Sequence, residues 1–336
     1  MERYSRQILF TSIGEEGQKK LLASHVLIVG AGALGCANAE MLARAGVGKI
    51  TIIDRDYVDW SNLGRQQLFT EEDVALKLPK AIAAKNHLRK INSSIEIDAI
   101  VGDFTLDFET QIQNVDLIID GTDNFETRFF INDIAMKYEK PWIYGAVVRS
   151  YGLTASIIPK KTPCLHCMLQ TIPSDGMTCD TVGVISPAVQ MVASYQTAEA
   201  LKYLTTQEVS KHLVSFDVWT REFAKVDITK IKQNNCPSCG EHPIYPYLKG
   251  DVGLKTAVLC GRNTVQIRPP KKQRISLPDI SNRLKPIVQD LKANNYLISF
   301  LAEEVRVVVF QDGRALIHGT KEEEKAKQIY QKYLGA

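Results

Sequence analysis

The sequence has almost no excess charge and no long apolar run, and each absence excludes a class of protein. Its 41 Lys and Arg residues are balanced by 38 Asp and Glu residues, so the net charge of +3 does not indicate a nucleic acid or membrane partner. The least polar stretch, residues 26–47, is interrupted by Glu40, Arg44 and several glycines and does not fit a membrane span. The first residues, MERYSRQ, lack the apolar segment of a secretory signal peptide, so we expect a cytoplasmic protein.

Cysteine is scarce, and its distribution favours a metal over disulfide bonds. The chain has 7 cysteines, an odd number, and a disulfide framework is not expected without an export signal. Four of them form two C-x-x-C motifs, Cys164 with Cys167 and Cys236 with Cys239. Two such motifs predict a four-cysteine zinc site that clamps distant segments, with two redox-active dithiols as the alternative. Four cysteine ligands leave zinc no open position, so we expect this metal to be structural.

The sequence does carry a nucleotide-binding fingerprint near its N-terminus. A buried strand is predicted over residues 26–29, followed by the G-x-G-x-x-G turn of Gly30, Gly32 and Gly35 and by a helix. A second strand, over residues 50–53, leads directly into Asp54. Glycines allow close approach of a phosphate, the start of the helix faces the anion, and the carboxylate suits ribose hydroxyls.

Polar residues beyond the fingerprint indicate phosphate contacts. The segment Ser61-Asn62-Leu63-Gly64-Arg65 follows the second strand, at the edge where open α/β sheets bind ligands. Lys80 begins a predicted helix and is either a solvated helix residue or a further cation at the site. Asp123 follows a strand predicted over residues 115–120 and precedes a helix over residues 125–138; it either caps this helix or holds a magnesium ion.

The whole pattern predicts an α/β fold: a Rossmann-like doubly wound, mainly parallel sheet with antiparallel strands and the four-cysteine zinc clamp. Further strands are expected over residues 95–101, 141–148, 152–158, 213–218 and 223–228, and a long helix over residues 187–204. The strand over residues 152–158 should run antiparallel because the connection before it is too short for a crossover helix.

The C-terminal part differs in character and predicts a separate small α+β unit. We expect strands over residues 256–260, 264–269, 296–302, 305–310 and 314–319, and helices over residues 280–292 and 321–334. This unit shows no catalytic constellation. The predicted organisation is a domain over residues 1–240, a Pro- and Gly-rich linker over 241–250 and a small domain over 251–336.

Two segments outside the sheet carry further candidates. Residues 1–24 predict two short helices broken near residues 12–15, and Arg6 lies on what reads as a solvated arm. Cys179 lies in a loop rich in Gly, Pro, Ser and Asp over residues 171–183. It is either an inert free cysteine or, because such a loop exposes it, a nucleophile.

Together these motifs resemble the ubiquitin-activating superfamily, specifically its bacterial branch that adenylates sulfur-carrier proteins: the molybdopterin-synthase adenylyltransferases and the thiamine sulfur-carrier adenylyltransferases. The resemblance covers residues 3–240. It rests on Arg3-Tyr4-Ser5-Arg6-Gln7, the glycine turn, Asp54, Ser61 to Gln66, Lys80, Thr122-Asp123-Asn124, both cysteine motifs and Thr178-Cys179. Gly64 departs from the Gln that relatives commonly carry. The C-terminal unit resembles an extension of some bacterial members, and the resemblance assigns it no role.

The resemblance implies a chemistry and roles for single residues. The C-terminal carboxylate of a ubiquitin-like carrier ending in Gly-Gly attacks the α-phosphorus of ATP, and pyrophosphate leaves. By this resemblance Asp54 holds the ribose hydroxyls, and the turn around Gly32 and Ala33 lies against the nucleotide. The implied phosphate contacts are Asn62, Arg65 and Lys80, with Ser61, Leu63 and Gly64 beside them. Asp123, next to Asn124, would hold Mg²⁺. Arg6 would reach the site of the opposite subunit in a homodimer.

The resemblance leaves the carrier and the role of Cys179 open. We place the molybdopterin carrier first; in such relatives adenylation suffices, and a sulfurtransferase or cysteine desulfurase delivers sulfur. The alternative is the thiamine carrier, to which the cysteine matching Cys179 links covalently. More distant alternatives are an NAD-dependent oxidoreductase, which the fingerprint alone would fit, and an inactive module that binds a ubiquitin-like protein.

Overall fold

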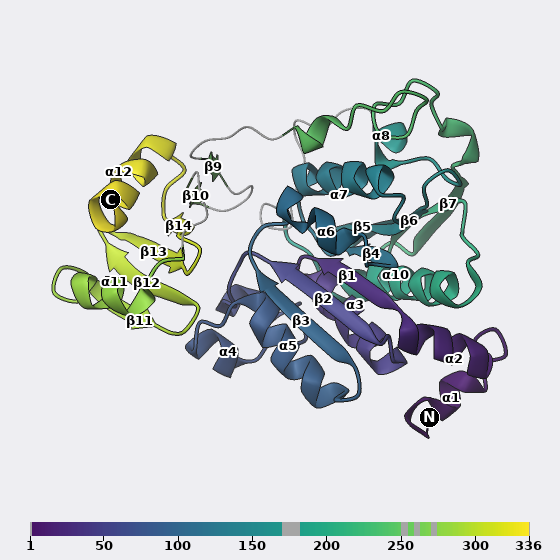
Figure 1. Ribbon diagram of the computed structural model, residues 1–336, viewed down its shortest axis with the longest axis horizontal. Helices are drawn as coiled ribbons and strands as arrows, with labels where there is room; N and C mark the ends of the chain where they lie inside the picture. The colour runs from purple at the N-terminus through teal and green to yellow at the C-terminus, as the bar shows by residue number, and fades with distance from the viewer. Residues whose placement is uncertain (1, 170–181, 250–254, 259–262, 270–273, 336) are drawn as a thin grey trace. The chain divides into compact units, whose positions relative to one another are not determined.

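The computed structural model describes residues 2–169, 182–249, 255–258, 263–269 and 274–335 of the chain (Figure 1). The chain divides into two compact units, Met1–Lys249 and Gly250–Ala336. None of the helices in these described segments combines the length and the apolar character needed to cross a bilayer.

The first unit is built on an 8-stranded sheet of order β3-β2-β1-β4-β5-β6-β7-β8 (Figure 1). Its strands are β1 His25–Val29, β2 Lys49–Asp54, β3 Glu96–Val101, β4 Leu117–Asp120, β5 Trp142–Val148, β6 Tyr151–Ile157, β7 His212–Asp217 and β8 Glu222–Asp227. Strands β1 to β5 pair in parallel, whereas β6, β7 and β8 pair antiparallel, each with its predecessor. The predicted mixed, mainly parallel sheet is therefore confirmed.

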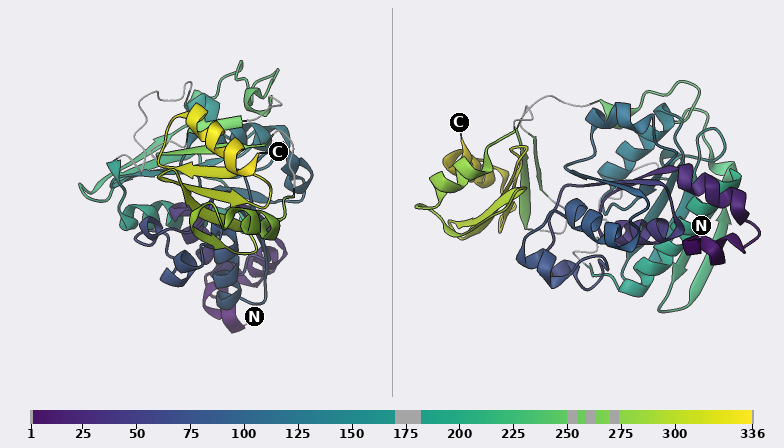
Figure 2. Two further views of the ribbon diagram at one scale, coloured as in Figure 1. Left: turned by 90° about the vertical axis from the view of Figure 1, so that its left-hand side faces the viewer. Right: turned by 60° about the horizontal axis from the view of Figure 1, so that its bottom comes forward.

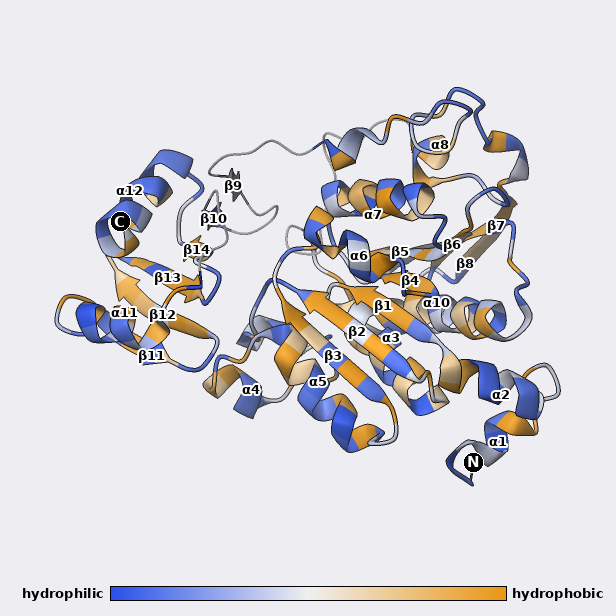
Figure 3. Cartoon of the chain, in the orientation of Figure 1, coloured by the Kyte–Doolittle hydropathy of each residue, from blue (hydrophilic) through white to orange (hydrophobic). Residues whose placement is uncertain are grey.

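Helices cover both faces of this sheet. They are α1 Ser5–Ile8, α2 Gly14–Ala23, α3 Ala33–Ala45, α4 Glu71–Ala75, α5 Lys80–Ile91, α6 Glu109–Ile112, α7 Phe125–Lys137, α8 Leu165–Met168 and α10 Ser186–Thr206, with 3₁₀ turns at Glu2–Tyr4, Trp60–Asn62, Leu106–Phe108, Thr229–Ile231 and Pro246–Leu248. Alternate residues of β1 point to two cores: Ile28 packs with α3, α5 and α10, and Leu27 packs with α7. This doubly wound arrangement explains why β1, β2 and β4 are nearly continuous apolar runs, which Figure 3 shows as mostly orange strands.

Residues 241–249 lie within the first unit. Tyr245, Tyr247 and Leu248 pack against the core beside α7, where the Tyr247 ring stacks on Phe129 with centroids 5.0 Å apart. The Tyr247 amide N–H donates to Asp133 over 2.8 Å. These contacts tie the chain to the first unit up to its boundary at Lys249.

The second unit is a 6-stranded antiparallel sheet of order β11-β12-β13-β14-β10-β9 with two helices. Its elements are β9 Lys255–Val258, β10 Thr264–Arg268, α11 Leu277–Leu284, β11 Gln289–Ala293, β12 Leu297–Ala302, β13 Val305–Phe310, β14 Ala315–His318 and α12 Glu323–Leu334. Leu284 and Ile329 from the two helices join a core with Phe300 and Val307 of the sheet.

One predicted element of this unit is wrong. The helix expected over residues 280–292 ends at Leu284, and Gln289–Ala293 forms strand β11 paired with β12. The reason is Pro286, which has no N–H to donate to the preceding turn and whose ring clashes with the helical carbonyl four residues earlier.

Candidate active site

The turn after β1 is shaped by glycines that let two backbones meet. Gly30 has a φ of +93°, and a Cβ atom there would lie 2.6 Å from the carbonyl oxygen of Gly121, in the turn after β4. A Cβ atom on Gly35 would lie 1.8 Å from the Gly30 carbonyl oxygen. Gly32 is the N-cap of α3 and offers no capping side chain. The N-terminus of α3 therefore keeps the N–H groups and the positive dipole end that favour an anion.

Asp54 ends β2 and braces this turn. Its Oδ2 accepts from the Ala31 amide N–H over 2.6 Å, and its Oδ1 accepts from the Asp56 amide N–H over 2.7 Å. Burial raises the pKa of Asp54, and the nearby Lys80 ammonium opposes that shift. An acidic residue at the end of the second strand, beside the glycine turn, is where dinucleotide-binding folds hold ribose hydroxyls.

Lys80 is not a solvated helix residue, although its position in sequence allowed that interpretation. Only 3% of the residue is exposed, and its Nζ lies 2.8 Å from Asp56 Oδ2. The Lys80 amide N–H also donates to the Asp56 carbonyl over 2.9 Å, which places the start of α5 directly beside the end of β2. The structure thus brings this ammonium to the same carboxyl edge of the sheet as Asp54. Ligands of open α/β sheets bind at this edge, and we call it the crevice.

The segment between β2 and α4 is fixed by its own caps. Asn62 is 3% exposed, and its Oδ1 accepts from the Asp59 amide N–H over 3.0 Å, while Asp59 accepts in return from the Ser61 amide N–H. Arg65 donates to the Ser61 carbonyl over 2.8 Å. The amide of Asn62 and the guanidinium of Arg65 are thereby held on one short turn, with Leu63 and Gly64 between them.

Asp123 and Asn124 follow β4 on the neighbouring strand end. Asn124, not Asp123, caps α7: its side chain accepts from the Thr127 amide N–H over 2.9 Å. The capping alternative for Asp123 is therefore wrong: α7 begins at Phe125, as predicted, and the residue directly before it is Asn124. Asp123 is exposed, and an exposed carboxylate beside a phosphate site suits Mg²⁺, which takes one or two carboxylates and keeps several waters.

A buried ion pair holds the turn that carries Asp123. Arg128 donates through Nε to Asp120 over 3.0 Å and through Nη2 to the carbonyls of Thr122 and Gly145 over 2.8 and 2.9 Å. Asp120 in turn accepts from both the amide and the hydroxyl of Thr122. Burial is the largest single influence and disfavours the charge on Arg128, but Asp120, Tyr144 and Asp123 together outweigh it, so the pKa of Arg128 is raised.

The four cysteines of the two C-x-x-C motifs converge on one point. Their sulfur atoms all lie within 4.8 Å of one another, with Cys164 3.4 Å from Cys236 and Cys167 3.5 Å from Cys239. Sulfurs around a tetrahedral zinc with Zn–S bonds of about 2.3 Å are about 3.8 Å apart. The donor set and spacing fit a metal ion bound across the two motifs, and the pairing across motifs disfavours two separate dithiols.

Comparison with known proteins agrees with this geometry, because residues 4–238 match the ThiF family. The chain belongs to the ThiF family. It is 50% identical to the Bacillus subtilis protein named sulfur carrier protein ThiS adenylyltransferase, over 99% of both chains. It is 34% identical to the Escherichia coli molybdopterin-synthase adenylyltransferase, over 72% of this chain and 97% of that protein. The expected resemblance is confirmed, and the chain is an enzyme of the nucleotidyltransferase class.

Solved structures support the same fold. A crystal structure of E. coli MccB with AMPCPP and MccA superimposes with a TM-score of 0.62 at 24% identity, covering 71% of this chain and 74% of that one. The shared part corresponds in extent to the first unit of this ThiF family member, whereas the Bacillus subtilis relative spans the second unit as well.

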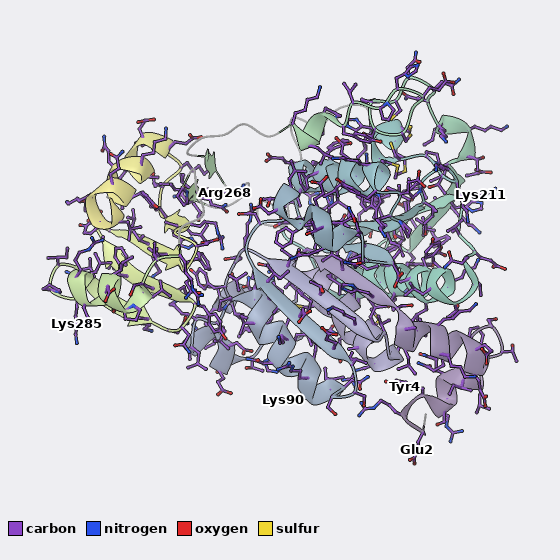
Figure 4. All side chains as sticks on the ribbon, viewed as in Figure 1. Glu2, Tyr4, Lys90, Lys211, Arg268 and Lys285 are labelled. Atoms are coloured by element: carbon purple, nitrogen blue, oxygen red, sulfur yellow. The ribbon has the colours of Figure 1, made fainter. Side chains whose placement is uncertain are left out.

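Arg6 is the predicted site residue that the structure does not bring to the crevice. Helix α1 lies at the carboxyl ends of α3 and α5: Gln7 donates to the Ala45 carbonyl over 2.9 Å, and the Tyr4 hydroxyl accepts from Asn92 over 2.9 Å (Figure 4). The helices run against the parallel strands, so this is the amino edge of the sheet. The 13 residues of α3 span about 20 Å, and this length separates the amino edge from the glycine turn. Figure 2 shows the same N-terminal helices at the margin of the first unit in both views.

Cys179 lies outside the described residues.

Sequence analysis did not identify three charged residues of the crevice: Arg55, Asp56 and Asp103. Arg55 lies 3.3 Å from Asp103, which follows β3, and Asp56 holds Lys80. Burial opposes the charge on Arg55, but Asp103, Asp123 and Asp56 outweigh it and raise its pKa. The only signal in the sequence was their position directly after predicted strands, which many loop residues share.

Proposed function

We propose that this enzyme uses ATP to adenylate the C-terminal glycine of a ubiquitin-like sulfur-carrier protein, releasing pyrophosphate. The observation that carries the proposal is the 50% identity to the Bacillus subtilis ThiS adenylyltransferase over 99% of both chains. The crevice supports it, since Asp54, Asn62, Arg65 and Lys80 follow β2 and Asp123 follows β4, the two strands that flank β1 and its glycine turn. A nicotinamide-dependent oxidoreductase has no use for the two cations Arg65 and Lys80 in this set.

The reaction gathers negative charge that these residues neutralise. As the carrier carboxylate attacks the α-phosphorus, charge grows on the α-phosphoryl oxygens and on the departing pyrophosphate. In the proposal Asp54 fixes the ribose, and Asn62, Arg65 and Lys80 bind the phosphates. Asp123 would hold Mg²⁺, which would supply positive charge to offset the charge of the phosphates. Positioning and electrostatics supply most of the rate in such a step, so no protein nucleophile is required for adenylation.

Two further parts of the proposal concern the metal and the oligomer. We assign structural zinc to Cys164, Cys167, Cys236 and Cys239, where it joins the chain after β6 to the chain after β8. We also infer a homodimer in which Arg6 of one subunit enters the crevice of the other. The support is its place on an exposed arm at the amino edge, where it is remote from the crevice of its own subunit.

The carrier is the finer question. The greater identity to the ThiS adenylyltransferase now favours the thiamine carrier over the molybdopterin carrier that sequence analysis placed first, because it extends through the second unit. For the thiamine carrier a later covalent step at Cys179 is the corresponding hypothesis, and a sulfurtransferase or cysteine desulfurase would supply sulfur. Both carriers share the Gly-Gly terminus that the adenylation step needs.

Pyrophosphate exchange tests the proposal. The purified enzyme is incubated with ATP, Mg²⁺ and labelled pyrophosphate, with a thiamine-type carrier, a molybdopterin-type carrier or neither. We expect exchange with one carrier and none when its terminal glycine is deleted. Absence of exchange with every Gly-Gly carrier would exclude adenylation, and a change in nicotinamide absorbance without ATP would favour the oxidoreductase instead.

A further inference from the structure

Lys80 is buried at the start of α5, where an ammonium needs a fixed counter-charge. Its side chain is 4% exposed, and the nearest carboxylate, Asp56, is itself 14% exposed. A buried lysine without such a partner would be costly to keep charged. An ammonium has three donors, and the contact with Asp56 at 2.8 Å engages one of them.

Asp56 accepts two hydrogen bonds from Lys80, one from its side chain and one from its backbone. Its carboxylate accepts from Nζ of Lys80, and its carbonyl accepts from the amide N–H of the same residue over 2.9 Å. Asp56 is itself fixed, because its amide N–H donates to Asp54 and its Oδ1 accepts from the Tyr57 amide N–H over 2.8 Å. One residue therefore joins the position assigned to ribose binding to the cation assigned to the phosphates.

We propose that Asp56 is a positioning residue that holds the Lys80 ammonium in the direction of the triphosphate of ATP. The inference rests on the proposed function, since it is the phosphates that Lys80 would meet. Without Asp56, the lysine side chain has no fixed direction at the crevice and is free to turn toward Asp54, the other carboxylate within its electrostatic reach. A misplaced cation weakens phosphate contacts that must be aligned for an in-line displacement.

The test is a mutant cycle between the two residues. D56A, D56N, D56E, K80A and the D56A/K80A double variant are compared in carrier-dependent pyrophosphate exchange, at a temperature where circular dichroism shows each to be folded. We expect D56A and D56N to lower kcat/KM for ATP on the order of 10²-fold, and D56E to restore part of the loss. In the K80A background, D56A should cost less than about twofold, because the group that it positions is gone.

A matched control removes a carboxylate from another lysine pair on the same sheet. Glu96 lies 2.6 Å from Lys49 at the amino edge, so E96Q removes the same charge far from the crevice and should leave exchange unchanged. Equal losses from D56A with and without Lys80 would overturn the proposal, as would a D56A variant with normal kcat/KM. A merely structural ion pair would lower the Tm of D56A and leave exchange by the folded enzyme intact.

Binding of a non-hydrolysable ATP analogue, measured by calorimetry, separates this inference from the proposed function. If the native enzyme binds the analogue but exchanges no pyrophosphate with any carrier, adenylation is excluded. The coupling of Asp56 to Lys80 can still be measured, from the Kd of the analogue for the native enzyme and the single and double variants. We expect D56A to weaken binding in the native background and to have no further effect in K80A. Failure of the native enzyme to bind the analogue would overturn both.

Discussion

Single residues of the crevice differ in what their loss would do, and Arg65 gives the cleanest case. Arg65 is only partly buried and donates to the Ser61 carbonyl of its own turn, so we expect its removal to leave the core intact. We expect R65A to lower pyrophosphate exchange by about 10²- to 10³-fold, the cost of removing one transition-state donor, with an unchanged Tm. R44A is the matched control, since Arg44 pairs with Glu40 near the end of α3. Normal exchange in R65A would remove Arg65 from the site.

The role of Cys179 can be separated from adenylation by a single atom. Adenylation needs a carboxylate, ATP and metal, and no thiol takes part in it. We therefore expect C179S to retain pyrophosphate exchange within about twofold of the native rate, because neither charge nor bulk changes at the phosphates. Loss of exchange in a folded C179S protein would instead place the cysteine in the first chemical step.

The positions of candidate site residues were predictable where they lie close together in one local unit of the chain. Pairings that depend on packing between distant segments were not. The glycine turn and Asp54 are linked by one strand–helix–strand unit, so their spacing carries the function. The pairing of Lys80 with Asp56, and of Arg128 with Asp120, depends on how α5 and α7 pack on the sheet. Asp123 was ambiguous because Asp and Asn both cap helices well, and a difference of one residue in the start of α7 decides between them.

At the scale of elements, the sheet of the first unit was predicted well because its strands are apolar runs bounded by turns. In the second unit, the helix predicted over residues 280–292 was wrong because its last part forms a strand without a clear apolar run. Residues 280–292 have helical spacing, but Pro286 ends α11, and the residues after it gain ladder hydrogen bonds with β12. The alternation of β11, with only Leu291 partly buried, is too weak for a strand to be read from sequence.

The turn after β4 depends on the ion pair between Arg128 and Asp120, both nearly inaccessible to solvent. Removing one partner leaves a buried charge uncompensated, so we expect R128A to lower the free energy of unfolding by about 3–5 kcal/mol. K137A, on the same helix, breaks an exposed pair with Glu109 and should cost about 0–1 kcal/mol. Denaturant unfolding followed by circular dichroism measures both. Equal costs would show that the pair does not stabilise the turn.

The cysteine cluster joins two segments that are far apart in the sequence. Cys164 and Cys167 lie at α8, whereas Cys236 and Cys239 follow β8. We expect C236S to lose bound zinc and to unfold at a lower Tm, because structural zinc in small peptides contributes on the order of 10 kcal/mol of binding energy. C179S is the control and should keep its zinc, measured by elemental analysis. Full zinc content in C236S would exclude the four-cysteine site.

For the whole molecule, the decisive feature is that Arg6 and the crevice lie at opposite edges of one sheet. The aromatic ring of Tyr4 packs over Gly46, where a Cβ atom would lie 2.5 Å from it, and this contact fixes the start of the arm on its own subunit. Leu9 and Phe10, which follow Arg6, are 69% and 60% exposed. Arg6 on this arm could therefore contribute only to the crevice of another copy of the chain. A single sequence does not show contacts between copies, so sequence analysis indicated a solvated segment.

Subunit complementation tests this arrangement. R6A and K80A chains with different tags are co-expressed, and mixed dimers are isolated by two affinity steps. In a mixed dimer the crevice of the R6A chain has a native Lys80 and receives a native Arg6 from its partner, so about half of the native exchange should return. A mixture of K80A with R65A should recover nothing, because each crevice then lacks a residue of its own. No recovery from R6A with K80A, or no mixed dimer to isolate, would refute the transfer of Arg6 between subunits.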